Sequence, residues 1–234
     1  MATETYYGIE ATSDVYGFTI NKGSRSGIFV QIAHFGEGPK SIQNGINVGW
    51  HVFPELYGDS ETHFYVFWTR DGYQETGCYN LRCPGYVPEP NIPTLPGIAI
   101  NSVSDPDGVK HSIIIKIFKD PRTGDWLVHV GFDSKPYLVG RFPKSLFPGL
   151  NKKADAVRLA GYAVTPTTNL VPMGSGFLPD NPKAASFSNI QLINQNGVPS
   201  KVQHDQPAVI IDKKVYSVSP INGDGKFTYG GPWK

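Results

Sequence analysis

The chain has 234 residues, of which 26 are glycine, 20 are proline and 18% are charged; this length and this richness in turn residues fit one large all-β domain better than a bundle of long helices. The formal net charge is +1 without a Lys/Arg stripe, so nothing predicts a nucleic-acid partner. No apolar run approaches the ~18 residues of a membrane-spanning helix, so no membrane partner is predicted either.

Short runs rich in β-branched and aromatic residues recur along the chain between turn residues, which is the pattern of an antiparallel all-β domain. The predicted strands are Val15–Ile20, Ile28–His34, Asn47–Phe53, His63–Thr69, Ile98–Ser102, His111–Phe118, Trp126–Phe132, Tyr137–Phe142, Val157–Val164, Ala184–Ile193, Ala208–Ile211 and Lys226–Tyr229. The string SIIIKIF is apolar almost throughout, which predicts a central strand buried on both faces. Helical turns are predicted only at Lys144–Leu150 and Lys152–Val157. No domain boundary is visible, so we expect a single domain over residues 1–234.

Two cysteines, Cys78 and Cys83, lie in the string TGCYNLRC. Their spacing differs from the CxxC of redox proteins, and two cysteines cannot complete a four-thiolate zinc site. Two interpretations stay open. A local disulfide would indicate an oxidising compartment, whereas two free thiols would fit a cytoplasmic protein. The chain shows no apolar segment at its start, so it reads either as a cytoplasmic protein or as the mature part of an exported one.

The common chemical motifs are missing from the sequence. The six histidines form no HExxH pattern and none pairs with a cysteine at ligand spacing, so no metal site is predicted. Ser175 lacks the context of a nucleophile elbow, and no glycine-rich phosphate loop opens a helix, so no cofactor is predicted. The residue chemistry by itself indicates an all-β domain and no particular reaction.

Several strings, taken together and in this order, resemble the neprosin family of plant proteins over nearly the whole chain. The first are Ile46-Asn47-Val48-Gly49-Trp50, Pro54-Glu55-Leu56-Tyr57-Gly58-Asp59 and Phe67-Trp68-Thr69-Arg70-Asp71-Gly72-Tyr73. The next is Thr76-Gly77-Cys78-Tyr79-Asn80-Leu81-Arg82-Cys83-Pro84-Gly85-Tyr86, and two short ones follow, Pro172-Met173-Gly174-Ser175-Gly176 and Tyr229-Gly230-Gly231-Pro232.

The resemblance implies an antiparallel β-sandwich of two stacked sheets with a concave cleft. Neprosins are secreted prolyl endopeptidases made with a signal peptide and a propeptide, so it also implies a secreted or vacuolar protein. In the family the two cysteines are disulfide-linked, which here would join Cys78 and Cys83. Two glutamates, in I-E-x-G-W and G-G-E-V strings, face each other across the concave sheet and activate a water molecule.

This chain departs from the family at both glutamates. The first string falls on Ile46–Trp50 and places Asn47 at the glutamate, and the second falls on Ala160–Ala163 and places Tyr162 there. An amide has no useful basicity, and a tyrosine with an ordinary pKa of about 10 is rarely a base at acid pH. The family mechanism needs a carboxylate to accept a proton from water, so we expect no glutamic peptidase activity.

Residues two apart on a strand share a face, so Gly49 and His51 should align with Asn47, and Ala160 with Tyr162. The former active site would then hold an amide, an imidazole and a phenol, with His51 as the group that titrates near neutral pH. We take Tyr162, Asn47 and His51 as candidate catalytic residues. The candidate binding residues around them are Gly49, Trp50, Trp68 and Ala160.

Three functions are compatible with these residues. The first is a non-proteolytic protein that binds a peptide, glycan or small molecule in the old cleft, where rings and amides favour such ligands. The second is a repurposed isomerase, cyclase or lyase of plant specialised metabolism that uses Tyr162, Asn47 and His51. The third is a defence or storage protein with no cleft function. The sequence does not define the oligomeric state.

Overall fold

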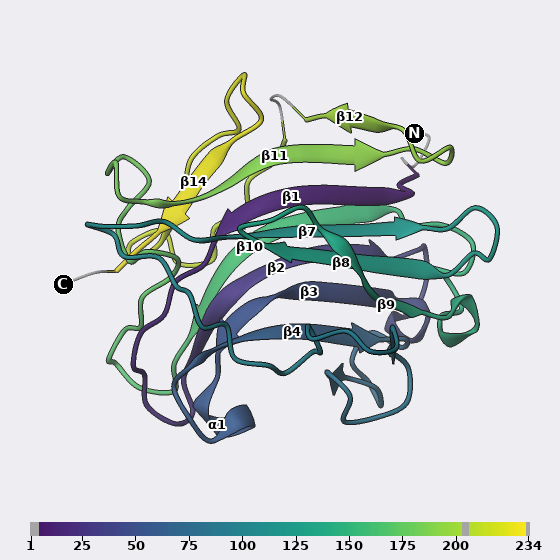
Figure 1. Cartoon of the computed structure of the whole chain (residues 1–234), viewed down its shortest axis with the longest axis horizontal. Helices are drawn as coiled ribbons and strands as arrows, with labels where there is room; N and C mark the ends of the chain where they lie inside the picture. The colour runs from purple at the N-terminus through teal and green to yellow at the C-terminus, as the bar shows by residue number, and fades with distance from the viewer. Residues whose placement is uncertain (1–4, 203–205, 233–234) are drawn as a thin grey trace.

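The computed structural model describes residues 5–202 and 206–232. Two antiparallel sheets stack face to face, one of nine strands and one of five (Figure 1). The order of the larger sheet is β13-β14-β11-β1-β7-β8-β9-β6 with β12 paired to β11, and that of the smaller sheet is β10-β2-β3-β4-β5. The predicted all-β fold, an antiparallel sandwich of two stacked sheets, is confirmed.

The smaller sheet consists of β2 (Arg25–His34), β3 (Asn44–Val52), β4 (Thr62–Thr69), β5 (Cys78–Tyr79) and β10 (Ala156–Val164). The larger sheet consists of β1 (Gly8–Asp14), β6 (Val87–Pro88), β7 (Ser112–Lys119), β8 (Trp126–Phe132), β9 (Tyr137–Phe142), β11 (Ala185–Ile193), β12 (Pro199–Lys201), β13 (Ser217–Val218) and β14 (Phe227–Gly230). The helical pieces are α1 (Pro54–Tyr57) and two 3₁₀ turns, Lys40–Ile42 and Lys144–Leu146. None of the described helices is long and apolar enough to cross a membrane.

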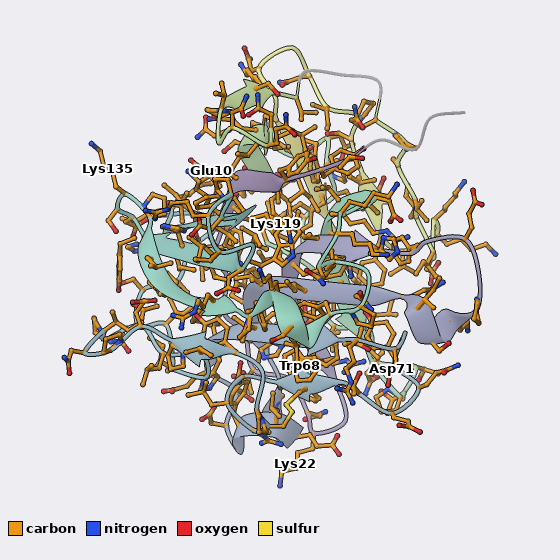
Figure 2. All side chains as sticks on the ribbon, turned by 90° about the vertical axis from the view of Figure 1, so that its right-hand side faces the viewer. Glu10, Lys22, Trp68, Asp71, Lys119 and Lys135 are labelled. Carbon is orange, nitrogen blue, oxygen red and sulfur yellow. A yellow bond between two sulfur atoms is a disulfide. The ribbon has the colours of Figure 1, made fainter. Side chains whose placement is uncertain are left out.

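The core lies between the two sheets and is built by alternation along the strands. In β3, Ile46, Val48 and Trp50 are fully buried against the larger sheet, while the residues between them point to the opposite face. The indole N–H of Trp50 donates to the carbonyl oxygen of Asp14 at 2.9 Å, at the end of β1. This hydrogen bond ties the smaller sheet to the larger one through a buried side chain. Figure 2 shows how densely side chains fill the space between the layers.

The strand SIIIKIF is central in the larger sheet, as β7 between β1 and β8, but it is not buried on both faces. Ile113, Ile115 and Ile117 are at most 1% exposed, whereas the alternate residues Ile114 and Phe118 are only half-buried. The prediction was wrong because no layer of the described chain covers the outer face of this sheet.

Three predicted strands are absent. The segment 15–20 follows β1 and makes only one isolated bridge, although Val15 is buried, and 98–102 likewise makes one bridge, at Ala99. Residues 208–211 form no strand, with Val209 86% and Ile211 99% exposed. Of the two predicted helical turns only the first forms, over Lys144–Leu146, because β10 already begins at Ala156.

The smaller sheet allows a very close approach of β2 and β3 at Gly49. A Cβ on Gly49 would lie 2.1 Å from the carbonyl oxygen of Ile28, which is inside van der Waals contact with backbone. The side chain of Tyr65, paired with Gly49 on β4, crosses this bare position and donates its hydroxyl to the same Ile28 oxygen at 3.1 Å. Glycine at this position is therefore required by the packing of three strands.

We predict that Gly49→Ala destabilises the fold by about 1–3 kcal/mol, the usual cost of inserting a methyl group into packed structure. Gly223→Ala is the matched control, since a Cβ there meets nothing within 4 Å. Thermal unfolding followed by circular dichroism measures both. Equal midpoints for the two variants would contradict the steric account.

Candidate functional site

The candidate site is the outer face of the smaller sheet, defined as the side of β10, β2, β3, β4 and β5 that points away from the core. The registers of these strands place on it the following residues: Arg25, Gly27, Phe29, Gln31, Asn47, Gly49, His51, His63, Tyr65, Phe67, Tyr79, Arg158, Ala160 and Tyr162. Strands β10, β2 and β3 bend along their length in Figure 1. No strand position described on this face is an aspartate or a glutamate.

At one end of the outer face, His51 connects two tyrosines. Its Nδ1 is 3.1 Å from the hydroxyl of Tyr162, and its Nε2 is 2.8 Å from the hydroxyl of Tyr57 at the end of α1. Gly27 pairs with both His51 and Tyr162, so a residue without a side chain separates them and the phenol reaches the imidazole. The His51 ring is fully buried and stacks on Tyr65 with ring centroids 3.9 Å apart.

The hydrogen bonds at Asn80 determine the proton positions in the hydrogen-bond network that leads to Tyr162. The backbone N–H of Val66 donates to Asn80 Oδ1, so the amide nitrogen of Asn80 faces Tyr57 and donates to its hydroxyl at 3.0 Å. We assign the Tyr57 proton to the hydrogen bond with His51 Nε2, because the Tyr57 oxygen already accepts from Asn80. A neutral imidazole with this acceptor carries its proton on Nδ1 and donates it to Tyr162. The Tyr162 hydroxyl thus receives one hydrogen bond from His51 and is also hydrogen-bonded to the hydroxyl of Tyr65.

Burial keeps all members of this hydrogen-bond network neutral. Removal from water, with further contributions from His63 and Arg25, lowers the pKa of His51 well below its ordinary value. Burial likewise raises the pKa of Tyr57 to about 12 and raises that of Tyr162 strongly. The expectation that His51 titrates near neutral pH is therefore corrected. Both of its nitrogens face tyrosine hydroxyls, so the imidazole itself is not presented to an external molecule.

Asn47 lies farther along the face and does not stand opposite Tyr162. Gln31 on β2 pairs with Asn47 on one side and with Arg158 on the other, whereas Tyr162 shares its row with His51. The side-chain amide of Gln31 donates to Asn47 Oδ1 at 2.8 Å. The structure thus brings Tyr162 and His51 together and places Asn47 in a separate amide pair.

The predicted binding residues fall on both sides of the sheet. Gly49 and Ala160 lie on the outer face, paired with Tyr65 and Phe29. Trp50 and Trp68 point the other way, because each lies one residue from an outward position. Trp50 is fully buried in the core and does not line the outer face.

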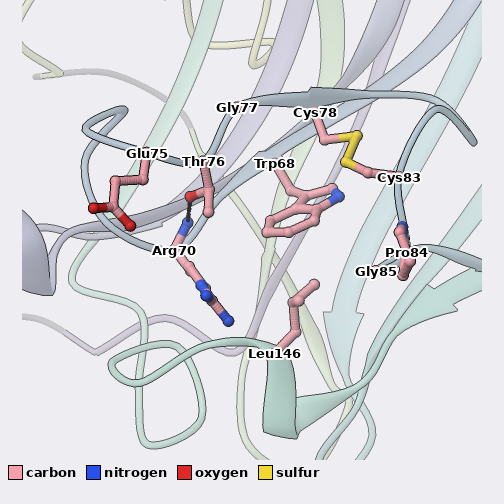
Figure 3. A pocket seen from close by; sticks show the side chains of 10 residues that line it. All are labelled: Trp68, Arg70, Glu75, Thr76, Gly77, Cys78, Cys83, Pro84, Gly85 and Leu146. Atoms are coloured by element: carbon pink, nitrogen blue, oxygen red, sulfur yellow. Dashed lines mark hydrogen bonds between the residues drawn. A yellow bond between two sulfur atoms is a disulfide. The ribbon is translucent and has the colours of Figure 1, made fainter.

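Trp68 packs beside the Cys78–Cys83 disulfide, which the structure contains and which decides between the two interpretations of the cysteines. Figures 2 and 3 show the indole next to the sulfur–sulfur bond. The side chain lines a cavity of about 540 Å³ at the edge of the sheet. A second cavity of about 150 Å³ lies between residues 19–24 and 167–172.

Sequence reasoning missed Tyr57, Tyr65 and Asn80, although each belongs to a string or strand that it had noticed. Tyr65 alternates with His63 and therefore shares its face. Asn80 adopts a left-handed backbone with φ of 55°, a conformation in which asparagine is enriched. What no pattern indicated is that α1 folds back so that the Tyr57 hydroxyl meets His51.

Asp59, Glu61 and His63 are the described group with ligand atoms close enough to share a cation, all within 4.8 Å of one another. His63 Nε2 is already 2.9 Å from Asp59 Oδ1, and His63 Nδ1 is 2.9 Å from the carbonyl oxygen of Gly97. The His63 ring stacks on Tyr57 with centroids 3.7 Å apart. The group orders the turn that presents Tyr57, and we assign no ion to it.

We predict that folding stability falls as pH decreases from about 6.5, the ordinary histidine pKa, towards 4. Since burial lowers the pKa of His51 in the folded state, the unfolded chain binds more protons in this range and is favoured by acid. His129, with a pKa lowered to about 4 by burial, adds to the same slope. Urea unfolding at several pH values measures this, and His51→Gln should make the slope shallower. An unchanged slope in that variant would contradict the burial of a neutral His51.

Among solved structures, the chain is similar to one described as scytalido-glutamic peptidase with a transition state analog inhibitor. The TM-score is 0.51 with 11% sequence identity, covering 98% of this chain and 94% of that one, which at this identity establishes the fold alone. The family model described as Neprosin matches residues 21–232. The chain therefore belongs to the Neprosin family.

Proposed function

We propose that this neprosin-fold protein has no glutamic peptidase activity and binds a peptide, glycan or small molecule on the outer face of the smaller sheet. The observation that carries the proposal is the make-up of that face: aromatic rings, amides and arginines, with no aspartate or glutamate among its described strand positions. Activating water for peptide hydrolysis requires a group that accepts its proton. None of the described strand positions on this face supplies a carboxylate for that role, and the loop carboxylate of Asp59 is already engaged with His63.

The residues at the two positions aligned with the family glutamates support the same conclusion. Asn47 is an amide whose oxygen already accepts a hydrogen bond from Gln31. Tyr162 is held as a neutral phenol by burial, which raises its pKa far above that of a carboxyl group. Neither is a base at the acid pH at which carboxyl pairs work, and the register keeps the two apart.

The aromatic side chains supply surfaces on which a ligand can stack. The rings of Phe67 and Tyr79 have centroids 4.5 Å apart, and Tyr73, which is 58% exposed, stacks on Phe67 at 5.8 Å. Flat exposed rings of this kind bind sugar faces and the rings and prolines of peptides through apolar contact. The half-buried amide of Asn47 lies beside Phe67 and adds a directional polar contact.

Two arginines add positive charge to the same face. The ion pairs that arginines form within the described residues involve Arg122 and Arg141, so Arg25 and Arg158 have none there. The guanidinium group of Arg158 lies 4.4 Å from the centre of the Phe35 ring, and Arg25 donates to the Tyr79 hydroxyl at 3.5 Å. Such stacked guanidinium groups are pre-oriented to bind oxygen acceptors of a ligand.

A second candidate function is a repurposed isomerase, cyclase or lyase. The hydrogen-bond network that runs from Asn80 through Tyr57 and His51 to Tyr162 favours it. In that function the neutral Tyr162 phenol gives its proton to the substrate as a general acid. The Nδ1–H of His51 stabilises the phenolate that results. A third candidate, a defence or storage protein, needs none of these contacts. For all three, the disulfide favours a secreted or vacuolar location.

Measurements of ligand binding and of substrate turnover distinguish the three candidate functions. We predict saturable binding of at least one member of a set of oligosaccharides and proline-containing peptides, measured by surface plasmon resonance. Removing a stacking ring with Phe67→Ala should weaken binding by about 10-fold or more, since one stacked aromatic is worth about 0.5–1.5 kcal/mol beyond its buried area. Lys135→Gln, on the loop joining β8 to β9, is the control and should bind as the wild type does.

The Tyr162→Phe variant decides between binding and catalysis. It removes one hydroxyl and should leave ligand affinity within about 2-fold, because that oxygen already faces His51. If the wild type converts a bound small molecule and Tyr162→Phe abolishes the conversion, the enzyme candidate holds instead. If Phe67→Ala and Lys135→Gln behave alike with every ligand, the outer face is not the binding surface.

A further inference from the structure

The polar groups that the outer face leaves free are mainly hydrogen-bond donors. The Oδ1 atom of Asn47 accepts from Gln31, so the amide nitrogen of Asn47 is the part that remains free. The Oε1 atom of Gln31 is buried, which withdraws that acceptor from a ligand. The described strand positions of this face include no aspartate or glutamate. A ligand of this face must therefore supply the acceptors.

Arg25 places a cation at one end of the face. Its guanidinium group lies 5.3 Å from the centre of the Phe53 ring and donates from Nη1 to the Tyr79 hydroxyl at 3.5 Å. The described arginine ion pairs belong to other arginines. The Nε and Nη2 atoms of Arg25 have no partner among the described residues and are not buried, so a ligand can reach them.

The hydroxyl of Tyr79 is a second donor beside this cation. Its oxygen accepts from Arg25, and its own proton has no acceptor among the described residues. The ring is held against Phe67 and Tyr65, with centroids 4.5 Å and 6.0 Å away, and the adjacent Cys78 is fixed by its disulfide. A guanidinium group and a phenol that both donate, with no described carboxylate paired to them, form a site for a carboxylate.

Arg158 places a second cation towards the other end of the face. It pairs across the sheet with Gln31, six residues from Arg25 along β2, which at about 3.3 Å per residue sets the two positions roughly 20 Å apart. Its guanidinium group stacks on Phe35. The carboxylate of Asp155, three residues before it, accepts instead from two backbone N–H groups. Two cations at this spacing fit a chain molecule with several carboxylates better than one small acid.

An acidic oligosaccharide matches these donors better than a peptide does. Uronic acid rings carry carboxylate, ring and glycosidic oxygens, which only accept, and their apolar faces can stack on Phe67 and Tyr79. A peptide main chain brings one N–H donor with each acceptor. The strands of the outer face pair their own backbone groups with one another, so those peptide donors would gain no partner there.

We propose that the outer face binds an oligosaccharide of uronic acids, one carboxylate of which accepts from the Arg25 guanidinium group and from the Tyr79 hydroxyl. A second carboxylate farther along the oligosaccharide reaches Arg158. The sugar rings between them cross the aromatic side chains, where the amide nitrogen of Asn47 donates to a ring or glycosidic oxygen. The proposed ligand class rests on the binding function proposed for the outer face.

Ligands that differ in charge test this class on the wild-type protein. Pentagalacturonate should bind saturably in isothermal titration calorimetry. Its methyl ester has the same rings without the charge and should bind about 10-fold more weakly or worse, since it loses hydrogen bonds between charged groups. Pentaglutamate, a peptide with at least as many carboxylates, should bind more weakly than pentagalacturonate. Equal affinity for the acid and its ester, or an equal or higher affinity for pentaglutamate, would overturn the proposal.

Variants test the carboxylate site. Arg25→Gln should weaken pentagalacturonate binding by about 10-fold or more, and Tyr79→Phe, which keeps the ring, by about 3-fold. Arg122→Gln is the control and should leave the affinity unchanged, because that side chain is 89% exposed on the turn between β7 and β8. Thermal unfolding shows whether each variant remains folded. Unchanged affinity in a folded Arg25→Gln variant would contradict the site.

The Phe67→Ala variant separates the ligand class from the binding function. Neutral oligosaccharides or proline-containing peptides that bind and are weakened by Phe67→Ala, with no preference for the acid and no effect of Arg25→Gln, would overturn the ligand class alone. The outer face would then remain the binding surface. If no ligand responds to Phe67→Ala, the binding function and the ligand class both fail.

Discussion

The close approach of β2 and β3 at two glycines is the constraint on which the outer face depends. A Cβ on Gly27 would lie 2.2 Å from the carbonyl oxygen of Trp50, and one on Gly49 would lie 2.1 Å from that of Ile28. Each bare position is crossed by a tyrosine from a neighbouring strand: Tyr162 reaches over Gly27 to His51, and Tyr65 reaches over Gly49 to Ile28. The two glycines have no side chains and therefore leave space for the rings of Tyr162 and Tyr65.

This arrangement determines the chemistry that the face can carry out. His51 has a phenol at each nitrogen and a third phenol stacked on its ring, so it is buried without a carboxylate beside it. Burial then favours the neutral imidazole. A neutral hydrogen-bond network of this kind holds the Tyr162 hydroxyl in place and suits proton donation. It does not suit the removal of a proton from water.

Strands were predicted correctly where the apolar pattern and the flanking turn residues indicate the same boundaries. Where these two signals disagree, strands were missed or placed wrongly. Trp126–Phe132 and Tyr137–Phe142 match β8 and β9 residue for residue, because a short turn separates two clearly patterned runs. The first strand, β1, was missed because GIEATSD has few apolar residues. The segment 15–20 was mistaken for a strand because its apolar residues enter the core without pairing in a ladder.

Local sequence patterns also predicted only part of the candidate site. Period-two alternation was enough to place Asn47, Gly49 and His51 on one face. The relative position of Tyr162 depends on which strands are neighbours and in which register, and no local pattern carries that information. Trp68, in turn, could be singled out from its string, but its place on the inward side beside the disulfide follows from the pairing of β4 with β5.

We propose that this Neprosin-family fold lacks the groups needed for peptide hydrolysis. Incubation of a proline-containing peptide with the protein at acid pH, followed by mass spectrometry, tests it most directly. We expect the peptide to remain intact after prolonged incubation. Cleavage after proline that disappears in Asn47→Ala would contradict it.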